Sequence, residues 1–168
     1  MKRMLASIDI GAHSARLLIV EADRNGAYET IEDLEIPVPL GADVFKTGRI
    51  SNQSVSMLCE IMKKFKWKMQ EYRITEYCAI ATSAVREAEN ADIFLERVHF
   101  LSGLDIKIFT GTDEARLGYL AVQSVIPSNF RFDEQTLLLA DIGTGACQVS
   151  LFDHGVMRFT ETIKLGTL

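Results

Sequence analysis

The sequence has few of the residues that build cross-linked or metal-bound scaffolds. It contains only three cysteines and three histidines. Cys59, Cys78 and Cys147 are odd in number, lie far apart and form no CxxC pair, which argues against a disulfide framework and a zinc site. We therefore expect a protein of a reducing compartment and interpret it as cytoplasmic.

Other features that the sequence lacks argue against membrane, secreted and nucleic-acid-binding proteins. No apolar run approaches the roughly 20 residues of a membrane-spanning helix, so we expect no membrane partner. The N-terminal apolar stretch ends at Asp9 without a small-residue cleavage site, so no signal peptide is expected. The formal net charge is -5, which argues against a broad nucleic-acid surface, since such surfaces cluster Lys and Arg. The one basic run, residues 63–68, lies in a predicted amphipathic helix and is interpreted as a solvated face.

The composition that is present is that of a soluble globular protein. Of 168 residues, 48% are hydrophobic and 24% are charged, and no segment is of low complexity. This balance predicts a buried core and at least one compact domain.

The first part of the chain predicts a mixed sheet. Apolar strands at 4–10 and 15–22 flank the turn GAHS, and Asn25-Gly26 precedes a third strand at 27–36, as in an antiparallel meander. A loop with Pro37, Pro39, Gly41 and Gly48 is expected next. Helices and strands then alternate: a helix capped by Ser51, a strand at 77–81, a helix at 90–101, a strand at 106–109 and a helix at 113–125. Alternation predicts parallel crossovers, so the fold class is α/β with a mixed five-stranded sheet and flanking helices.

The opening pattern returns near the C-terminus. Residues 127–135 break the preceding helix, and a strand at 137–142, the turn GTG, a strand at 147–152 and a strand through Thr162 follow. We predict a first lobe at residues 1–126 and the opening β-meander of a second, similar lobe at residues 136–168. No helix follows that meander, so we expect the second lobe to be truncated.

Two segments, Asp9-Ile10-Gly11 and Asp141-Ile142-Gly143, have the residue types of a phosphate cradle. Glycine at a strand end lets backbone N–H groups approach an anion closely. The preceding aspartate is badly placed to touch phosphate, but it can hold Mg²⁺ or a metal-bound water. An ordinary Asp-capped hairpin is the alternative for either turn alone. The recurrence at corresponding places in two lobes favours phosphate binding.

Three charged residues are candidates for chemistry near these turns. Glu114 opens a helix directly after a strand, at the rim where ligand sites of α/β sheets form, and it could act as a general base on water. The alternative is that Asp113 and Glu114 only complement the helix dipole. Arg16 and Arg86 could bind phosphate with two hydrogen bonds, or they could be surface residues.

Four motifs in this order resemble the exopolyphosphatase and guanosine pentaphosphate phosphohydrolase (Ppx/GppA phosphatase) family. The motifs are ASIDIGAHSARLLI, ATSAVREAEN, TGTDEARLGYLAV and LLLADIGTGACQVSLF. The resemblance spans nearly the whole chain. It implies the ribonuclease H-like lobe of the superfamily of actin, sugar kinases and chaperone ATPases.

The resemblance implies a Mg²⁺-dependent release of the terminal phosphate from inorganic polyphosphate or guanosine pentaphosphate. Glu114 would activate water, and Asp9 and Asp141 would hold the metal, which neutralises charge that repels the attacking water. The phosphate-binding residues would be Gly11, Ser14, Arg16, Arg86, Gly143, Thr144 and Gly145. The anion would lie between the lobes.

The chain departs from the family pattern in both loops. The second loop reads GTGACQ, so Gln148 stands where the family has a glutamate, and an amide neither takes a proton at neutral pH nor binds Mg²⁺ with charge. The first loop has Ala12 and His13 where Ser and Asn are commoner, and His13 is interpreted as a solvent-facing turn residue. A non-catalytic polyphosphate or nucleotide sensor is therefore the alternative.

The chain also ends where the family continues through most of its second domain. We expect the exposed second meander to find cover by pairing with another copy of the chain or with a partner, because exposed strand edges invite pairing. A homodimer is our hypothesis. A kinase-like transfer of phosphate is a third hypothesis, but nothing in the sequence supplies an adenine pocket.

Overall fold

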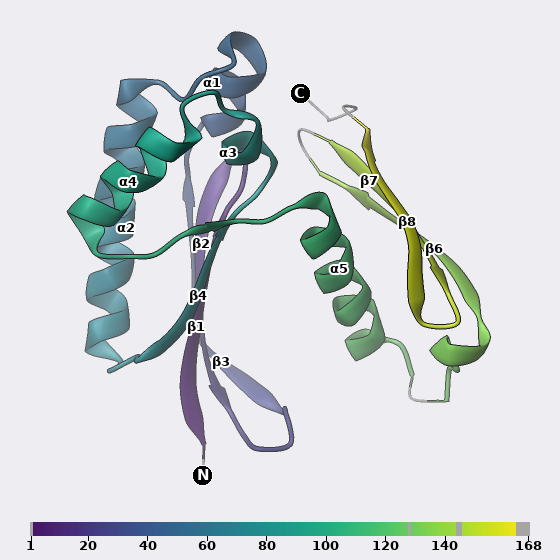
Figure 1. Ribbon diagram of the computed structural model, residues 1–168. Coiled ribbons are helices and arrows are strands. Elements are labelled where there is room, and N and C mark those ends of the chain that lie inside the picture. The colour runs from purple at the N-terminus through teal and green to yellow at the C-terminus, as the bar shows by residue number, and fades with distance from the viewer. Residues whose placement is uncertain (1, 128, 144–145, 164–168) are drawn as a thin grey trace. The chain divides into compact units, whose positions relative to one another are not determined.

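The computed structural model describes residues 2–127, 129–143 and 146–163 (Figure 1). Contacts divide the chain into two compact units, Met1–Ile108 and Phe109–Leu168. In the part of the chain that the structure describes, no helix has both the length and the apolar character needed to cross a membrane.

The first unit is built on a mixed five-stranded sheet. Its strands are β1 (Arg3–Ile10), β2 (Ser14–Ala22), β3 (Tyr28–Pro37), β4 (Glu76–Ala81) and β5 (Lys107–Ile108). They lie in the order β3-β2-β1-β4-β5. β1 to β3 are antiparallel neighbours, whereas β4 runs parallel to β1 and β5 parallel to β4. The predicted α/β class and its mixed sheet are confirmed.

Helices cover one face of this sheet (Figure 1). The long ones are α2 (Asn52–Glu71) and α4 (Ala91–Ser102). Alternate residues of β1 point into the core, and Ile8 and Ile10 have no exposed surface. Phe65 of α2 and Phe94 of α4 are each 1% exposed in the same core. The period-two pattern of β1 therefore selects the covered face.

One predicted loop is a helix in the structure. α1 (Leu40–Thr47) occupies most of the segment that we expected to be irregular because of its prolines and glycines. Pro39 stands at the N-cap, and Gly48 ends the helix in the left-handed conformation at φ 76°. Proline before a helix and glycine after it are compatible with helix ends, so the expectation of a loop was wrong.

The second unit is a three-stranded antiparallel sheet with one long helix. It contains α5 (Gly111–Val125), a short 3₁₀ turn (Phe132–Glu134), β6 (Thr136–Ile142), β7 (Cys147–Asp153) and β8 (Val156–Ile163). The strands lie in the order β6-β7-β8. His154 and Gly155 join β7 to β8 with φ values of 53° and 77°, the geometry of a tight hairpin turn. The predicted second meander is confirmed.

α5 packs on the sheet of the second unit. The Tyr119 ring stacks on Phe152 at a centroid distance of 4.1 Å. A Cβ on Gly118 would lie 3.3 Å from Leu139, so helix and strand are close there. The compact units thus divide before α5, whereas the sequence analysis assigned residues 113–125 to the first lobe. The apolar inner face of β6 and β7 accounts for this grouping.

Gln148 links β7 to the start of α5. Its side chain is 8% exposed, and its Nε2 donates to the Gly111 carbonyl at 2.6 Å. The donor must be the amide NH₂, because the carboxamide oxygen would face a second acceptor. A buried donor satisfied in this way stabilises the contact between helix and sheet.

This contact predicts that Gln148→Glu destabilises the fold. At neutral pH the carboxylate oxygen would face the Gly111 carbonyl, and we expect the free energy of unfolding to fall by about 1–3 kcal/mol. Gln148→Met keeps the length of the side chain but removes the donor, so its loss should be smaller, about 0.5–1.5 kcal/mol. Urea denaturation followed by circular dichroism measures both.

The loss of stability caused by Gln148→Glu should depend on pH. Burial raises the folded-state pKa of a carboxyl group above its unfolded value. The penalty is therefore fully present at pH 7 and fades as pH falls through the folded-state value, where the protonated acid can donate to Gly111. Equal losses at pH 7 and pH 4 would contradict the assigned hydrogen bond.

Candidate functional site

The first loop joins β1 to β2 at the edge where β1 and β4 end. The Gly11 amide donates to the Ser14 carbonyl at 2.9 Å, which closes a four-residue turn. The Ala12 carbonyl accepts from the Gly41 amide at 2.7 Å. A Cβ on Gly41 would lie 3.0 Å from the Ala12 Cβ, so the close approach of the two backbones requires glycine there. The start of α1 therefore supports the loop.

The side chains predicted to bind ligand at the first loop lie on one face of the sheet. Asp9 and Arg16 are cross-strand partners on β1 and β2. The Arg16 guanidinium donates to both carboxylate oxygens of Asp33 on β3, at 2.7 and 2.5 Å. The Ser14 hydroxyl donates to Glu35 on the same strand at 2.7 Å. The structure thus brings the predicted residues together, with both side-chain donors bonded to carboxylates.

The charges on this face shift one another's pKa values. Hydrogen bonds and charge from Asp33 raise the pKa of Arg16, while the Arg16 hydrogen bond lowers the pKa of Asp33. The Asp9 side chain reaches solvent, but desolvation by the surrounding protein raises its pKa, and the Arg16 charge opposes that rise. Asp9 is therefore a carboxylate with incomplete hydration, which a bound cation would favour in its charged form.

Arg86 lies on a short helix next to the first loop. That helix is α3 (Ser83–Glu87), and it begins where β4 ends. The Thr82 amide donates to the Ile10 carbonyl at 3.1 Å, and the Arg86 amide donates to the Thr82 carbonyl at 2.9 Å. The half-buried Arg86 is thus carried to the same sheet edge as Gly11. His13, in the loop itself, is exposed as expected.

The second hairpin is closed by a hydrogen bond like that of the first. The Gly143 amide donates to the Ala146 carbonyl at 2.9 Å, which matches the bond between Gly11 and Ser14. Thr144 and Gly145, both predicted to bind phosphate, lie outside the described residues. Both hairpins therefore have the same closing bond between the end of one strand and the start of the next.

Gln148 holds in the second hairpin the place that Arg16 holds in the first. Asp141 is the cross-strand partner of Gln148, as Asp9 is of Arg16. The Gln148 amide is engaged with Gly111, three residues before Glu114. Asp141, Gln148 and Glu114 therefore stand on adjoining elements of one unit.

Thr110 and Asp113 cap the start of α5 together. The Thr110 hydroxyl donates to the Asp113 carboxylate at 2.7 Å and accepts from the Asp113 amide at 3.2 Å. Hydrogen bonds from the Thr110 hydroxyl and the Thr110 amide to the carboxylate lower the pKa of Asp113. Glu114 is half-buried in the same turn. The helix-end explanation offered for the acidic pair thus applies to Asp113, whose side chain forms the capping box.

The carboxylates suit a metal ion only in part. Among the described residues, no group of three or more His, Cys, Asp or Glu could hold an ion. Asp9 and Asp141 each place one carboxylate at the end of a strand. Mg²⁺ commonly takes one or two carboxylates and completes its octahedron with water and phosphate oxygens. One strand-end carboxylate of this kind suits an ion only where water and phosphate oxygens supply its other ligands.

Sequence reasoning missed three residues that shape the site and the hydrogen bond of a fourth, Gln148, which it had singled out for another reason. Asp33 and Glu35 hold the side chains of the first loop, Gly41 supports its backbone, and Gln148 binds Gly111. The sequence offered one sign of Asp33 and Glu35: they are two residues apart in the predicted third strand, so both fall on the same face of the sheet. Their partners follow only from the register between β2 and β3.

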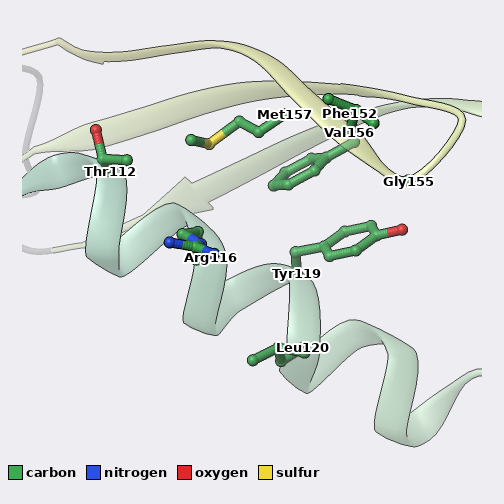
Figure 2. A pocket seen from close by; sticks show the side chains of 8 residues that line it. All are labelled: Thr112, Arg116, Tyr119, Leu120, Phe152, Gly155, Val156 and Met157. Carbon is green, nitrogen blue, oxygen red and sulfur yellow. The ribbon is translucent and has the colours of Figure 1, made fainter.

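A separate pocket lies between α5 and the turn that joins β7 to β8 (Figure 2). It is lined by Thr112, Arg116, Tyr119, Leu120, Phe152, Gly155, Val156 and Met157. This lining contains none of the residues predicted to bind phosphate or metal or to act as a base. The pocket is therefore distinct from both loops.

Three curated relatives match most of this chain. The bifunctional 3-dehydroquinate synthase/phosphatase of Fusobacterium nucleatum is 35% identical over 97% of the chain and 25% of the relative. The guanosine-5'-triphosphate,3'-diphosphate pyrophosphatase of Aliivibrio fischeri is 26% identical over 99% of the chain and 32% of the relative. Exopolyphosphatase 1 of Mycobacterium bovis is 30% identical over 87% of the chain and 41% of the relative. The chain thus spans between 25% and 41% of the length of these relatives.

Solved structures agree with this similarity. A Ppx/GppA family member from Aquifex aeolicus has a TM-score of 0.83 at 30% identity, over 99% of this chain and 52% of that one. The MreB5 protein of Spiroplasma citri has a TM-score of 0.51 at 14% identity, over 98% of this chain and 53% of that one. The second likeness concerns the fold alone, and it agrees with the expected actin-like architecture.

A family model confirms the expected relationship. The model of the Ppx/GppA phosphatase family matches residues 19–168, which include the helix of Glu114 and the second loop. The first loop precedes the matched range, but the relatives that cover 97% and 99% of the chain extend across it. The chain belongs to the Ppx/GppA phosphatase family.

Proposed function

We propose that this chain is the phosphate-binding and catalytic part of a Mg²⁺-dependent phosphohydrolase. Its substrate would be inorganic polyphosphate or guanosine pentaphosphate, from which it releases the terminal phosphate. The observation that carries the proposal is the position of Glu114, in the first turn of α5 beside a hairpin that repeats the turn of the first loop. The names of the relatives from Aliivibrio fischeri and Mycobacterium bovis support the two substrate classes.

Glu114 would act as the general base. Its carboxylate takes a proton from water while the water oxygen forms a bond to the terminal phosphorus. The bond from that phosphorus to the bridging oxygen breaks, and the shortened chain leaves with the bridging oxygen. Because Asp113 forms the capping box, the helix end does not depend on Glu114.

The two loops would bind and orient the anion. Gly11, Ser14 and Arg16, with Arg86 from α3, would contact phosphate oxygens at the first loop. Gly143 would do so at the second, together with Thr144 and Gly145. Mg²⁺, held by Asp9 and Asp141, would neutralise phosphate charge during attack.

A non-catalytic sensor of polyphosphate or nucleotide is the second candidate. Gln148 favours it, because an amide bonded to Gly111 at 2.6 Å supplies neither an acid nor a base. The enzyme hypothesis assigns the base to Glu114 and needs no proton transfer at Gln148. Tight binding without turnover would favour the sensor.

We also propose that the protein is a cytoplasmic homodimer. Cys59, Cys78 and Cys147 are free thiols, which fits a reducing compartment. The face of the second sheet that points away from α5 exposes large apolar side chains, including Leu138 and Ile142, each 70% exposed. Apolar surface of this kind favours association, and a second copy would cover it.

Glu114→Gln should abolish phosphate release and preserve binding. The amide keeps the shape of the side chain but cannot accept the proton, so the rate should fall by at least about 100-fold. Release of inorganic phosphate measures the rate, and titration calorimetry measures affinity. Glu161→Gln, the same change on an exposed position of β8, is the control. Turnover of the Glu114→Gln variant equal to that of the wild type would show that Glu114 is not the base.

Removal of Mg²⁺ should stop release. Chelation with EDTA leaves the phosphate charge unscreened, and activity should return on addition of excess Mg²⁺. Asp9→Asn should raise the Mg²⁺ concentration needed for half-maximal release, because one carboxylate ligand is lost. Full turnover in EDTA would contradict the requirement for metal.

Leu138→Asp should dissociate the homodimer. A charge on the outer face of the second sheet opposes burial against another copy. Sedimentation velocity at micromolar concentration should show a dimer for the wild type and a monomer for the variant. Ile93→Asp, on a side chain of α4 that is 67% exposed, should leave the dimer intact. A monomeric wild type would count against the proposal.

A further inference from the structure

The two side-chain donors of the first loop are already bonded to carboxylates. The Ser14 hydroxyl donates to Glu35 at 2.7 Å. The Arg16 guanidinium donates through Nε and Nη2 to the two oxygens of Asp33, at 2.7 and 2.5 Å. Two parallel N–H···O bonds of this kind are also how arginine binds phosphate. The carboxylates of β3 therefore stand where phosphate oxygens would be held.

The sheet register builds this arrangement. Arg16 pairs with Glu35 across β2 and β3, and with Asp9 across β1 and β2. Asp33 lies two residues from Glu35, so both acids point to the face that carries Arg16. Residues two apart on a neighbouring strand are within reach of a long side chain, which explains the diagonal pairing of Arg16 with Asp33.

The net negative charge of the side chains around Arg16 opposes the binding of an anion. Three carboxylates, Asp9, Asp33 and Glu35, surround the single guanidinium of Arg16. The side chains of Arg16 and Asp33 are 53% and 40% exposed, and an exposed ion pair is worth only about 0.2–1 kcal/mol. Such a pair can open when a stronger anion arrives. Until it opens, the Ser14 hydroxyl and the Nε–Nη2 edge of Arg16 are occupied by carboxylates and are not available to the anion.

We propose that Asp33 and Glu35 are internal competitors of the phosphate ligand and set the affinity of the first loop for anions. They occupy Arg16 and Ser14 in the free protein, and a phosphate group must displace them to bind. The proposal rests on the proposed function in one respect, that the first loop binds phosphate. It adds two residues of β3 that determine how tightly this loop binds.

The test compares binding of imidodiphosphate, whose P–N–P bridge resists hydrolysis, at fixed Mg²⁺ and ionic strength. The Asp33→Asn/Glu35→Gln double variant should bind about fivefold more tightly than the wild type, because two competing charges are removed from an exposed site. Isothermal titration calorimetry on the full chain measures both affinities. The gain should shrink as salt is added, since exposed charges are screened.

Glu29→Gln is the control for lost charge at a distance. Glu29 lies on β3 as well, six residues and so about 20 Å along the strand from Glu35. The substitution removes one carboxylate charge from the same strand, against two in the double variant, and we expect the wild-type affinity. A gain equal to that of the double variant would overturn the proposal.

Arg16→Ala tests whether the competitors act through Arg16. In that background, Asp33→Asn should change affinity by less than about twofold, because no guanidinium is left to release. An undiminished gain would mean that Asp33 acts by distant charge alone, and it would overturn the proposal. Circular dichroism of each variant checks that the sheet is intact.

Two outcomes separate this inference from the proposed function. If the wild type binds imidodiphosphate and the double variant binds no more tightly, the inference is wrong and the proposed function stands. If neither protein binds at any Mg²⁺ concentration tested, the first loop is not a phosphate site and both are overturned.

Discussion

The cross-strand register of the two hairpins is the constraint on which the rest of the structure depends. In each hairpin, a glycine amide bonds to the carbonyl three residues later, Gly11 to Ser14 and Gly143 to Ala146, both at 2.9 Å. This bond sets which residues face each other along the strands. A slip of one residue would move every side chain to the opposite face, so the turn decides both the core and the site.

The same register gives the two hairpins different chemistry. The position opposite the aspartate holds Arg16 in the first hairpin and Gln148 in the second. Arg16 is exposed and bonded to an acid, whereas Gln148 is buried and bonded to a backbone carbonyl. The same kind of hairpin thus carries an exposed ion pair in one lobe and a packing contact in the other. Equivalent backbone therefore does not imply equivalent function.

Much of the fold was predictable because its signals are local. Alternating apolar residues marked β1 and β2, Ser51 accepts from the Ser54 amide at the start of α2 as a cap should, and His154-Gly155 forms the turn before β8. α1 was missed because prolines and glycines at its ends were taken to indicate a loop. The pairing of Arg16 with Asp33 was missed because it depends on the register between β2 and β3, which shifts at Ile19 and Val20.

The placement of Glu114 follows from contacts that are distant in sequence. Its helix is capped locally by Thr110 and Asp113, but the helix start is tied to β7 by Gln148, 37 residues after Gly111. A substitution at Gln148 would therefore act on the proposed base through the position of α5, even though the amide itself transfers no proton. The Gln148 amide carries no charge and supplies a positioning hydrogen bond to Gly111. For that reason the glutamine is compatible with the proposed catalysis, in which the Glu114 carboxylate would act as the base.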